Sequence, residues 1–242
     1  MVLLSLFALA FILSLLQSSI AYSSTKFSTK SSLRTILFQS ASSVNDLDLQ
    51  TSRDILVRAS QTKSEEPDLV VNALLSLEKL MWAKSKNDNG ATAKATFEAL
   101  TGQWRLIFTT GTVDTQKKTG RINYFPLKAV QTFDAKTSVI TNSIFLGDFH
   151  LIKFSGEFEW VPAPRKVLFD FDKIAVLGLT FNLPKGGAAK IGSASGLGSE
   201  GNINLAKQNK KAFFNWISAD EDIATARGGG GGLALWRRVP VE

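Results

Sequence analysis

The stretch Leu100-Thr-Gly-Gln-Trp-Arg-Leu-Ile-Phe-Thr-Thr110 marks the point at which the hydrophobic pattern of this 242-residue chain changes. Upstream of it, apolar residues recur at intervals of three and four. From Gly102 onward, apolar and polar residues tend to alternate, which is typical of a β-strand with one buried face. The pattern predicts a strand over 103–110 with Trp104, Leu106 and Phe108 on one face.

Residues 46–90 are predicted to be a helical segment. Apolar side chains from Leu69 to Met81 form one stripe at helical spacing, and the turn-forming run Lys84–Gly90 ends it. We expect this stripe to pack on the domain's own core. The alternative, a helix lying on a membrane surface, is disfavoured because Glu65, Glu66 and other acidic residues would weaken attraction to anionic lipid.

Downstream of Gly102 the pattern predicts a series of short strands separated by turns. An initial helical segment followed by short strands at this spacing indicates an antiparallel barrel or sandwich. The glycine-rich stretch 186–201 lacks the strand, glycine loop and helix of a nucleotide site, so we expect a mobile loop near the barrel mouth. Gly228–Gly232 is expected to be a hairpin loop. The further strands are predicted at 128–133, 138–145, 149–161, 166–176, 179–183, 212–218 and 233–239.

The composition excludes much of ordinary enzyme chemistry. The chain has no cysteine and one histidine, so thiolate metal sites, iron–sulfur clusters, cysteine nucleophiles and paired-histidine metal sites are excluded. The glycines around 192–196 do not have the spacing of a serine nucleophile elbow. His150 is expected to be a turn or barrel-rim residue. We therefore predict no catalytic residue, no metal and no cofactor.

The net charge depends on the first 45 residues. The whole chain carries +7, of which Lys26, Lys30 and Arg34 supply +3, and residues 46–242 therefore carry +4. A modest positive charge suits contact with anionic lipid headgroups. Nucleic acid is not a predicted partner, because basic and aromatic residues do not interleave and the tightest lysine cluster is Lys207, Lys210 and Lys211.

The N-terminal segment has the composition of two targeting signals in series. Residues 1–21 contain an apolar run from Leu3 to Leu16 and small residues up to Ala21, as in a secretory signal peptide. Residues 22–45 are rich in hydroxyl side chains and lack acids, as in a plastid transit peptide. The pair resembles the bipartite leader of algae with a complex plastid, and predicts a mature start between 35 and 50. A secreted protein with a serine-rich linker is the alternative.

Two motifs resemble those of known families. Gly102-Gln-Trp104 resembles the lipocalin motif in which a tryptophan packs across the closed end of a barrel under a basic side chain. The longer match, 100–110 together with Asp222-Ile-Ala-Thr-Ala-Arg227-Gly228 and a last strand ending on Arg238, resembles the plastid lipid-associated proteins, the plastoglobulin or fibrillin family. The resemblance extends over about 66–240. Ala224 stands where that family commonly has an arginine, and the five glycines lengthen the last turn.

The resemblance implies a mainly β fold, an antiparallel lipocalin-like barrel at 91–242 preceded by the helical segment. It also implies a structural motif, in which Trp104 and Arg227 form a cation–π or capping pair at the closed end. Such a barrel can enclose one small hydrophobic molecule. The motif residues are Gly102, Trp104, Asp222, Arg227 and Gly228, and the candidate ligand-binding residues are Trp104, Phe108, Phe145, Phe158, Trp160, Phe169 and Phe171. The alternative for each of these aromatic residues is that it simply fills the core.

The function implied is that of a non-enzymatic plastid protein that binds or carries a carotenoid, a quinone or an acyl lipid. Its partners would be that hydrophobic molecule and a peripheral membrane surface, of the thylakoid or the plastoglobule. Two alternatives stay open, a ligand-free scaffold of thylakoid complexes and a barrel enzyme with a lipophilic substrate. The enzyme would need acids or bases inside the barrel. Alternation instead places the candidates outside: Glu157, Glu159, Asp170 and Asp172.

Overall fold

The structure is a computed structural model that describes residues 47–187 and 200–240. The predicted leader at 1–45 and most of the glycine-rich stretch 186–201 lie outside the described residues. The elements follow in this order: α2 (Leu49–Thr62), α3 (Pro67–Ser85), α4 (Ala91–Leu100), β1 (Gly102–Thr109), α5 (Val113–Thr119), β2 (Asn123–Tyr124), β3 (Lys128–Asp134), β4 (Val139–Leu146), β5 (Phe149–Val161), β6 (Lys166–Phe169), β7 (Lys173–Val176), β8 (Leu179–Asn182), α7 (Glu200–Lys207), β9 (Ala212–Ala219), β10 (Ile223–Gly228) and β11 (Leu233–Arg238).

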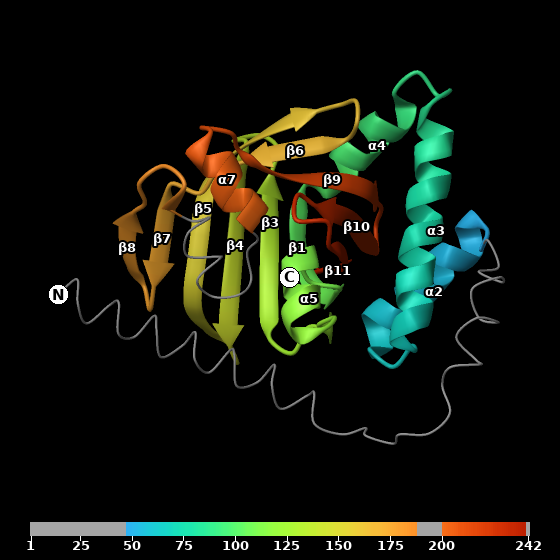
Figure 1. Cartoon of the computed structure of the whole chain (residues 1–242), viewed down its shortest axis with the longest axis horizontal. Helices are drawn as coiled ribbons and strands as arrows, with labels where there is room; N and C mark the ends of the chain where they lie inside the picture. The colour runs from blue at the N-terminus through green and yellow to red at the C-terminus, as the bar shows by residue number, and fades with distance from the viewer. Residues whose placement is uncertain (1–46, 188–199, 241–242) are drawn as a thin grey trace.

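Eight of the strands form a closed antiparallel barrel (Figure 1). Its order is β3-β1-β11-β10-β9-β6-β5-β4, and the ring closes because β4 pairs with both β3 and β5. β2 adds a short pairing to β1, while β7 and β8 extend the sheet from the first half of β5. The prediction of a mainly β, antiparallel barrel after an N-terminal helical segment is confirmed.

The barrel has two different ends. The first, which we call the closed end, lies at the start of β1 and includes Leu100, Trp104 and the β9–β10 turn at 220–222, which Arg238 contacts. The second, which we call the mouth, lies at the other end of the same strands. It consists of α5, the β4–β5 turn at 147–148, the β7–β8 turn at 177–178 and the β10–β11 hairpin at 229–232, to which Val113 N–H is bonded.

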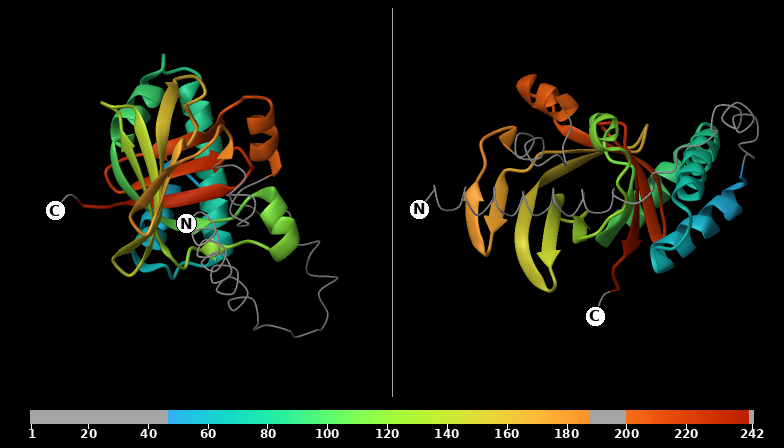
Figure 2. Two further views of the ribbon diagram at one scale, coloured as in Figure 1. Left: turned by 90° about the vertical axis from the view of Figure 1, so that its left-hand side faces the viewer. Right: turned by 60° about the horizontal axis from the view of Figure 1, so that its bottom comes forward.

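Helices α2 and α3 form a layer on the outer face of β1, β10 and β11 (Figure 2). Both begin with a side-chain cap, because the Asp48 carboxylate accepts the Thr51 N–H and the Glu66 carboxylate accepts the Leu69 N–H. Their buried stripe packs against β-strand residues that face out of the barrel. The stripe therefore packs on the domain's own core, as expected. The core residues are Ile55, Leu56, Ala59, Val70, Ala73, Leu74 and Leu77 from the helices and Phe108, Ile217, Ile223, Leu233 and Leu235 from the strands.

The structure contains five elements that were not predicted from sequence, namely α4, α5, β2, α7 and β10. Helix α4 begins after Gly90 and brings Phe97 against Trp160, with the rings 5.1 Å apart. Helix α5 lies between β1 and β2, where the sequence predicted only a turn between strands, and the Thr112 hydroxyl caps its first turn. Strand β10 has no clear alternation of large apolar and polar residues in its sequence. Its inward residues, Ala224 and Ala226, are small, and Thr225 between them is buried as well. Gly228–Gly232 forms the hairpin between β10 and β11.

The predicted strand 166–176 is interrupted. Its first part, β6, pairs with the end of β5 and with β9, whereas its second part, β7, pairs with an earlier part of β5 and with β8. The connecting residues pass over Gly156, where the Asp170 N–H bonds to Glu157 O and the Asp172 N–H bonds to Ser155 O. The long strand β5 thus pairs with β7 before Gly156 and with β6 after it.

The predicted face of β1 is wrong at Phe108. Trp104 and Leu106 face the barrel interior, but the pairing with β11 shifts between Leu106 and Phe108. Such a bulge inserts an extra residue and reverses the side-chain alternation beyond it. Phe108 therefore lies opposite Leu235, in the core under the helices.

We predict that Gly156→Ala strongly destabilises the fold. A Cβ at this position would lie 1.9 Å from the Asp170 carbonyl oxygen, so the backbone crossing would have to move apart. Overpacking of this kind costs about 1–3 kcal/mol or more, which urea unfolding would measure as a lower free energy of unfolding. Gly228→Ala is the control, because its Cβ would meet nothing closer than 3.8 Å. Equal stability of the two variants would contradict this explanation of the strand interruption.

Candidate functional site

The interior near the closed end is filled by aromatic rings. The Phe133 ring lies edge-on to both Phe158 and Trp216, with centroids 5.7 Å and 5.4 Å away, and Trp216 lies 5.3 Å from Trp236. Strand β10 makes room for the two indoles, because its inward residues are small. Ala226 pairs with Trp216, and Ala224 pairs with Trp236. These closely packed rings fill this half of the barrel with the protein's own side chains.

Trp104 and Arg238 seal the closed end. The Arg238 guanidinium lies 4.1 Å from the centre of the Trp104 ring, and the Trp104 indole N–H donates to Leu100 O at 2.8 Å. The guanidinium also donates to four backbone carbonyl groups, those of Ala99, Thr101, Asp220 and Glu221. A single arginine thereby joins α4, β1, β11 and the β9–β10 turn.

The cation over Trp104 is therefore Arg238, and the predicted pairing with Arg227 is wrong. β1 pairs with β11 such that Trp104 stands directly opposite Arg238. Arg227 alternates with inward Ala226, so it faces the helices and makes an ion pair with Glu78 of α3, at 2.7 Å from Nε. Arg227 thus fixes α3 to the barrel wall, which is a structural role of a different kind.

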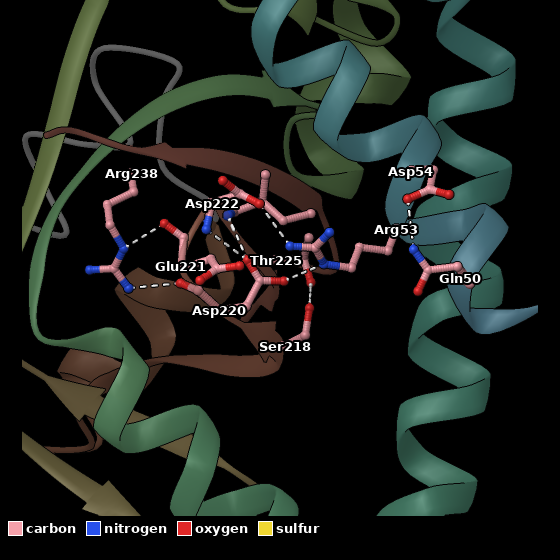
Figure 3. A network of polar contacts seen from close by, with 10 residues as sticks. Gln50, Arg53, Asp54, Ser218, Asp220, Glu221, Asp222, Thr225 and Arg238 are labelled. Atoms are coloured by element: carbon pink, nitrogen blue, oxygen red, sulfur yellow. Dashed lines mark hydrogen bonds and ion pairs between the residues drawn. The ribbon is translucent and has the colours of Figure 1, made fainter.

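A second set of ion pairs holds α2 at the closed end (Figure 3). Arg53 donates to Asp220 and to Asp222, each at 2.8 Å. Burial by itself raises the pKa of Asp220, but hydrogen bonds from Arg53 and from two backbone N–H groups outweigh it and hold the pKa below its usual value. The contribution of Asp220 to stability is present at neutral pH and is lost as the pH falls through that lowered pKa.

The half of the interior nearer the mouth is not filled in the same way. Register places several side chains on the inward face there that keep part of their surface accessible, whereas Trp104, Phe133 and Trp216 toward the closed end are buried. Accessible surface on an inward-facing side chain means that the space in front of it is open. These residues are Leu106, Ala129, Asn142, Ile144, Phe154, Phe214 and Ala234. Ile152 is an exception near the mouth, because it is buried against Ile174 and Val176 of β7.

Exposed apolar side chains surround the mouth. Leu146 and Phe149, beside the β4–β5 turn, are 65% and 71% exposed, and Leu177 and Leu179, beside the β7–β8 turn, are more than half exposed. Val113 of α5 is exposed as well. Lys117, Lys118, Lys128 and Lys153 belong to the elements that form the mouth, and Lys128 pairs with Asp148 of the β4–β5 turn. We call Val113, Leu146, Phe149, Leu177 and Leu179 the apolar rim.

The predicted ligand-binding residues divide into two groups. Phe108 lies under the helices, and Phe145 lies on the outer face of β4, with its ring tilted against that of His150 and Lys128 over its ring. His150 is thus a rim residue. It lines a shallow surface depression of about 250 Å³ together with Lys153, Ala175 and Gly178. The other candidates belong to the barrel core, mostly at its filled part: Trp104, Phe158, Trp160, Phe169 and Phe171.

Sequence reasoning missed the residues that line the accessible part of the interior. Phe154 and Phe214 are the large ones, and Phe154 continues the alternation of β5 two steps back from Phe158 through Gly156. Of the motif residues, Gly102 has φ +129 and leaves space for the Arg238 guanidinium, since a Cβ would lie 3.0 Å from it. Asp222 contacts Arg53, and Gly228 ends β10.

Within residues 47–187 and 200–240, no cluster of histidine, aspartate and glutamate side chains could hold a metal ion. Of the four acids considered for an enzyme, Glu157, Glu159 and Asp172 are exposed and Asp170 is half-buried, and Glu159 pairs with Lys211. No helix in the same part of the chain is long and apolar enough to cross a membrane.

Comparison with known families agrees with the geometry. The PAP_fibrillin family model matches residues 46–235, which include the helical layer and nearly all of the barrel. The chain belongs to the PAP_fibrillin family. Membership in this family and the barrel fold fit a plastid lipid-associated protein.

Other comparisons add little to the family assignment. No protein of curated function matches this PAP_fibrillin chain significantly. A crystal structure of an uncharacterised protein from Bacteroides eggerthii DSM 20697 is similar at a TM-score of 0.35 and 10% identity, over 58% of this chain and 99% of that one. At this TM-score the likeness does not bear on function.

We predict that Trp104→Ala lowers the free energy of unfolding by about 3–5 kcal/mol, the usual cost of truncating a fully buried large aromatic. Stability is lost because the variant removes the buried indole ring that closes this end of the barrel, and with it the surface on which Arg238 lies. Trp82→Ala is the control, since Trp82 is 54% exposed on α3 and should change stability by less than about 1 kcal/mol. Urea unfolding followed by circular dichroism measures both, and a Trp104 variant as stable as wild type would contradict the sealing role.

Proposed function

We propose that this protein binds a small hydrophobic molecule in the mouth half of its barrel and works at a lipid surface in the plastid, that of the thylakoid or the plastoglobule. One observation carries the proposal. The exposed apolar side chains gather at the same end of the barrel at which inward-facing residues are accessible. An opening framed by apolar residues is suited to exchange of an apolar ligand with lipid.

The rim also supports a defined orientation on the lipid surface. Leu146 and Phe149 project from one turn, and Leu177 and Leu179 from a second, so both turns can insert apolar side chains among lipid chains. Lysines around the rim would add about 1 kcal/mol of attraction for each that reaches an anionic surface. In this orientation the mouth faces the lipid, and a ligand could enter without crossing water.

The interior chemistry favours binding over catalysis. The polar side chains that face the described interior are the amides of Gln131 and Asn142, which are poor acids and bases. Carboxylates of β5 and of the β6–β7 connection face outward instead. We therefore infer a non-enzymatic role, in which the barrel holds and delivers its ligand.

We predict that Leu146→Ser with Phe149→Ser reduces binding to vesicles of anionic and galactolipid composition by more than tenfold. Each buried side chain of this size contributes about 1.5–3 kcal/mol when it leaves water. Co-sedimentation with vesicles measures the loss. The matched control is Leu75→Ser with Trp82→Ser, which removes exposed apolar residues from α3 and should leave vesicle binding unchanged.

Two outcomes would argue against the proposal. Equal losses in the rim and helix variants would show that the rim does not orient the protein on lipid. Vesicle binding without uptake of any hydrophobic probe by the barrel would favour the alternative of a ligand-free peripheral scaffold.

A further inference from the structure

Two amide side chains stand side by side inside the barrel. Gln131 of β3 pairs with Asn142 of β4, and Gln131 also stands opposite Trp104 of β1. On each strand the amide is two residues from a member of the aromatic core, since Phe133 follows Gln131 and Ile140 precedes Asn142. Residues two apart on a strand share a face, so both amides point into the interior.

The oxygen atoms of these amides are buried without a donor. Gln131 is only 5% exposed, and neither its Oε1 nor the Asn142 Oδ1 has a hydrogen-bond partner within the described part of the chain. A buried acceptor without a donor destabilises a folded protein, and apolar side chains of the same shape would avoid that cost. Stability of the barrel therefore gives no reason for two such oxygens to lie next to each other in its wall.

The position of the pair connects it with the mouth. On the side of the closed end the neighbours are Phe133 and Ile140, which are fully packed. On the side of the mouth the neighbours are Ala129 and Ile144, which remain partly accessible. A molecule entering through the mouth would thus lie along apolar residues, and its leading end would stop at the two amides.

We infer that the ligand is a hydrophobic alcohol, phenol or quinol that enters hydroxyl first and donates its O–H to the Gln131 and Asn142 oxygens. This inference rests on the proposed function, because it concerns the same interior. Two acceptor oxygens require a donor, which a hydroxyl group provides. An ionised carboxylate or the carbonyl of an oxidised quinone could accept hydrogen bonds from the amide N–H groups, but it would leave both buried oxygens without a donor, and an anion would also lose its hydration at this depth. Gln131 and Asn142 would then determine the class of ligand.

The test compares two probes with one carbon skeleton, β-ionol, which has a hydroxyl group, and β-ionone, which has a ketone in its place. Quenching of tryptophan fluorescence reports binding, because Trp216 and Trp236 lie in the barrel. Wild type should bind β-ionol about tenfold more tightly, which corresponds to about 1.4 kcal/mol and is the size of one hydrogen bond.

The double variant Gln131→Met, Asn142→Leu should lower the affinity for β-ionol to that for β-ionone and leave the ketone affinity unchanged. Its unliganded fold should be as stable as wild type or more stable, because the unpaired acceptors are gone. The control variant Thr132→Val, Thr141→Val changes the adjacent paired positions on the outward face of the same strands and should keep the preference for β-ionol.

The outcomes separate this inference from the proposed function. Equal affinity of wild type for both probes, or a preference that survives in the double variant, would overturn the hydroxyl inference alone. Failure of wild type to bind either probe would overturn both. The wild-type comparison needs no variant, so the inference stays testable even if the double variant does not fold.

Discussion

The interior of an eight-stranded barrel is only just wide enough for side chains to fill, and the structure depends on how this chain divides that space. Trp216 and Trp236 fit at the closed end because their partners on β10 are Ala226 and Ala224. Trp104 completes the packing at the closed end. Arg238 lies over its ring and is itself fixed by hydrogen bonds that it donates to backbone carbonyl groups. With the largest rings committed to one end, the inward residues at the other end are left partly accessible.

The helical layer uses the opposite face of the same strands. Residues of β10 and β11 alternate between small or aromatic inward side chains and Ile223, Leu233 and Leu235 against the helices. Arg53 and Arg227 then fix α2 and α3 by ion pairs. Because these helices cover the flank of the barrel (Figure 2), they leave the mouth and its apolar rim uncovered. One alternating pattern thus supplies both the packed closed end and the core under the helices, while the apolar rim stays exposed.

Local patterns predicted the fold well, because period, caps and turns are properties of neighbouring residues. The tryptophan after Gly102 was sufficient to place the sealed end. Sequence could not show the bulge that turns Phe108 outward or the arginine that covers Trp104, since both depend on the register between β1 and β11. Phe145 faces outward by the ordinary alternation of β4, because its neighbour Ile144 shares the inward face of Ile140 and Asn142. The open half of the interior depends on the packing of all eight strands, and no short pattern reports it.

The central claim is that the barrel is filled at one end and open at the other, and the absence of cysteine from the chain allows a direct measurement. Single cysteines at inward positions, Ala129→Cys and Ala234→Cys near the mouth and Ala224→Cys at the filled end, can be compared by their rates of alkylation with a small maleimide. We expect the two mouth cysteines to react readily in the folded protein, while Cys at 224 reacts only after unfolding. Equal protection of all three would contradict the claim, since it would mean that side chains fill the barrel throughout.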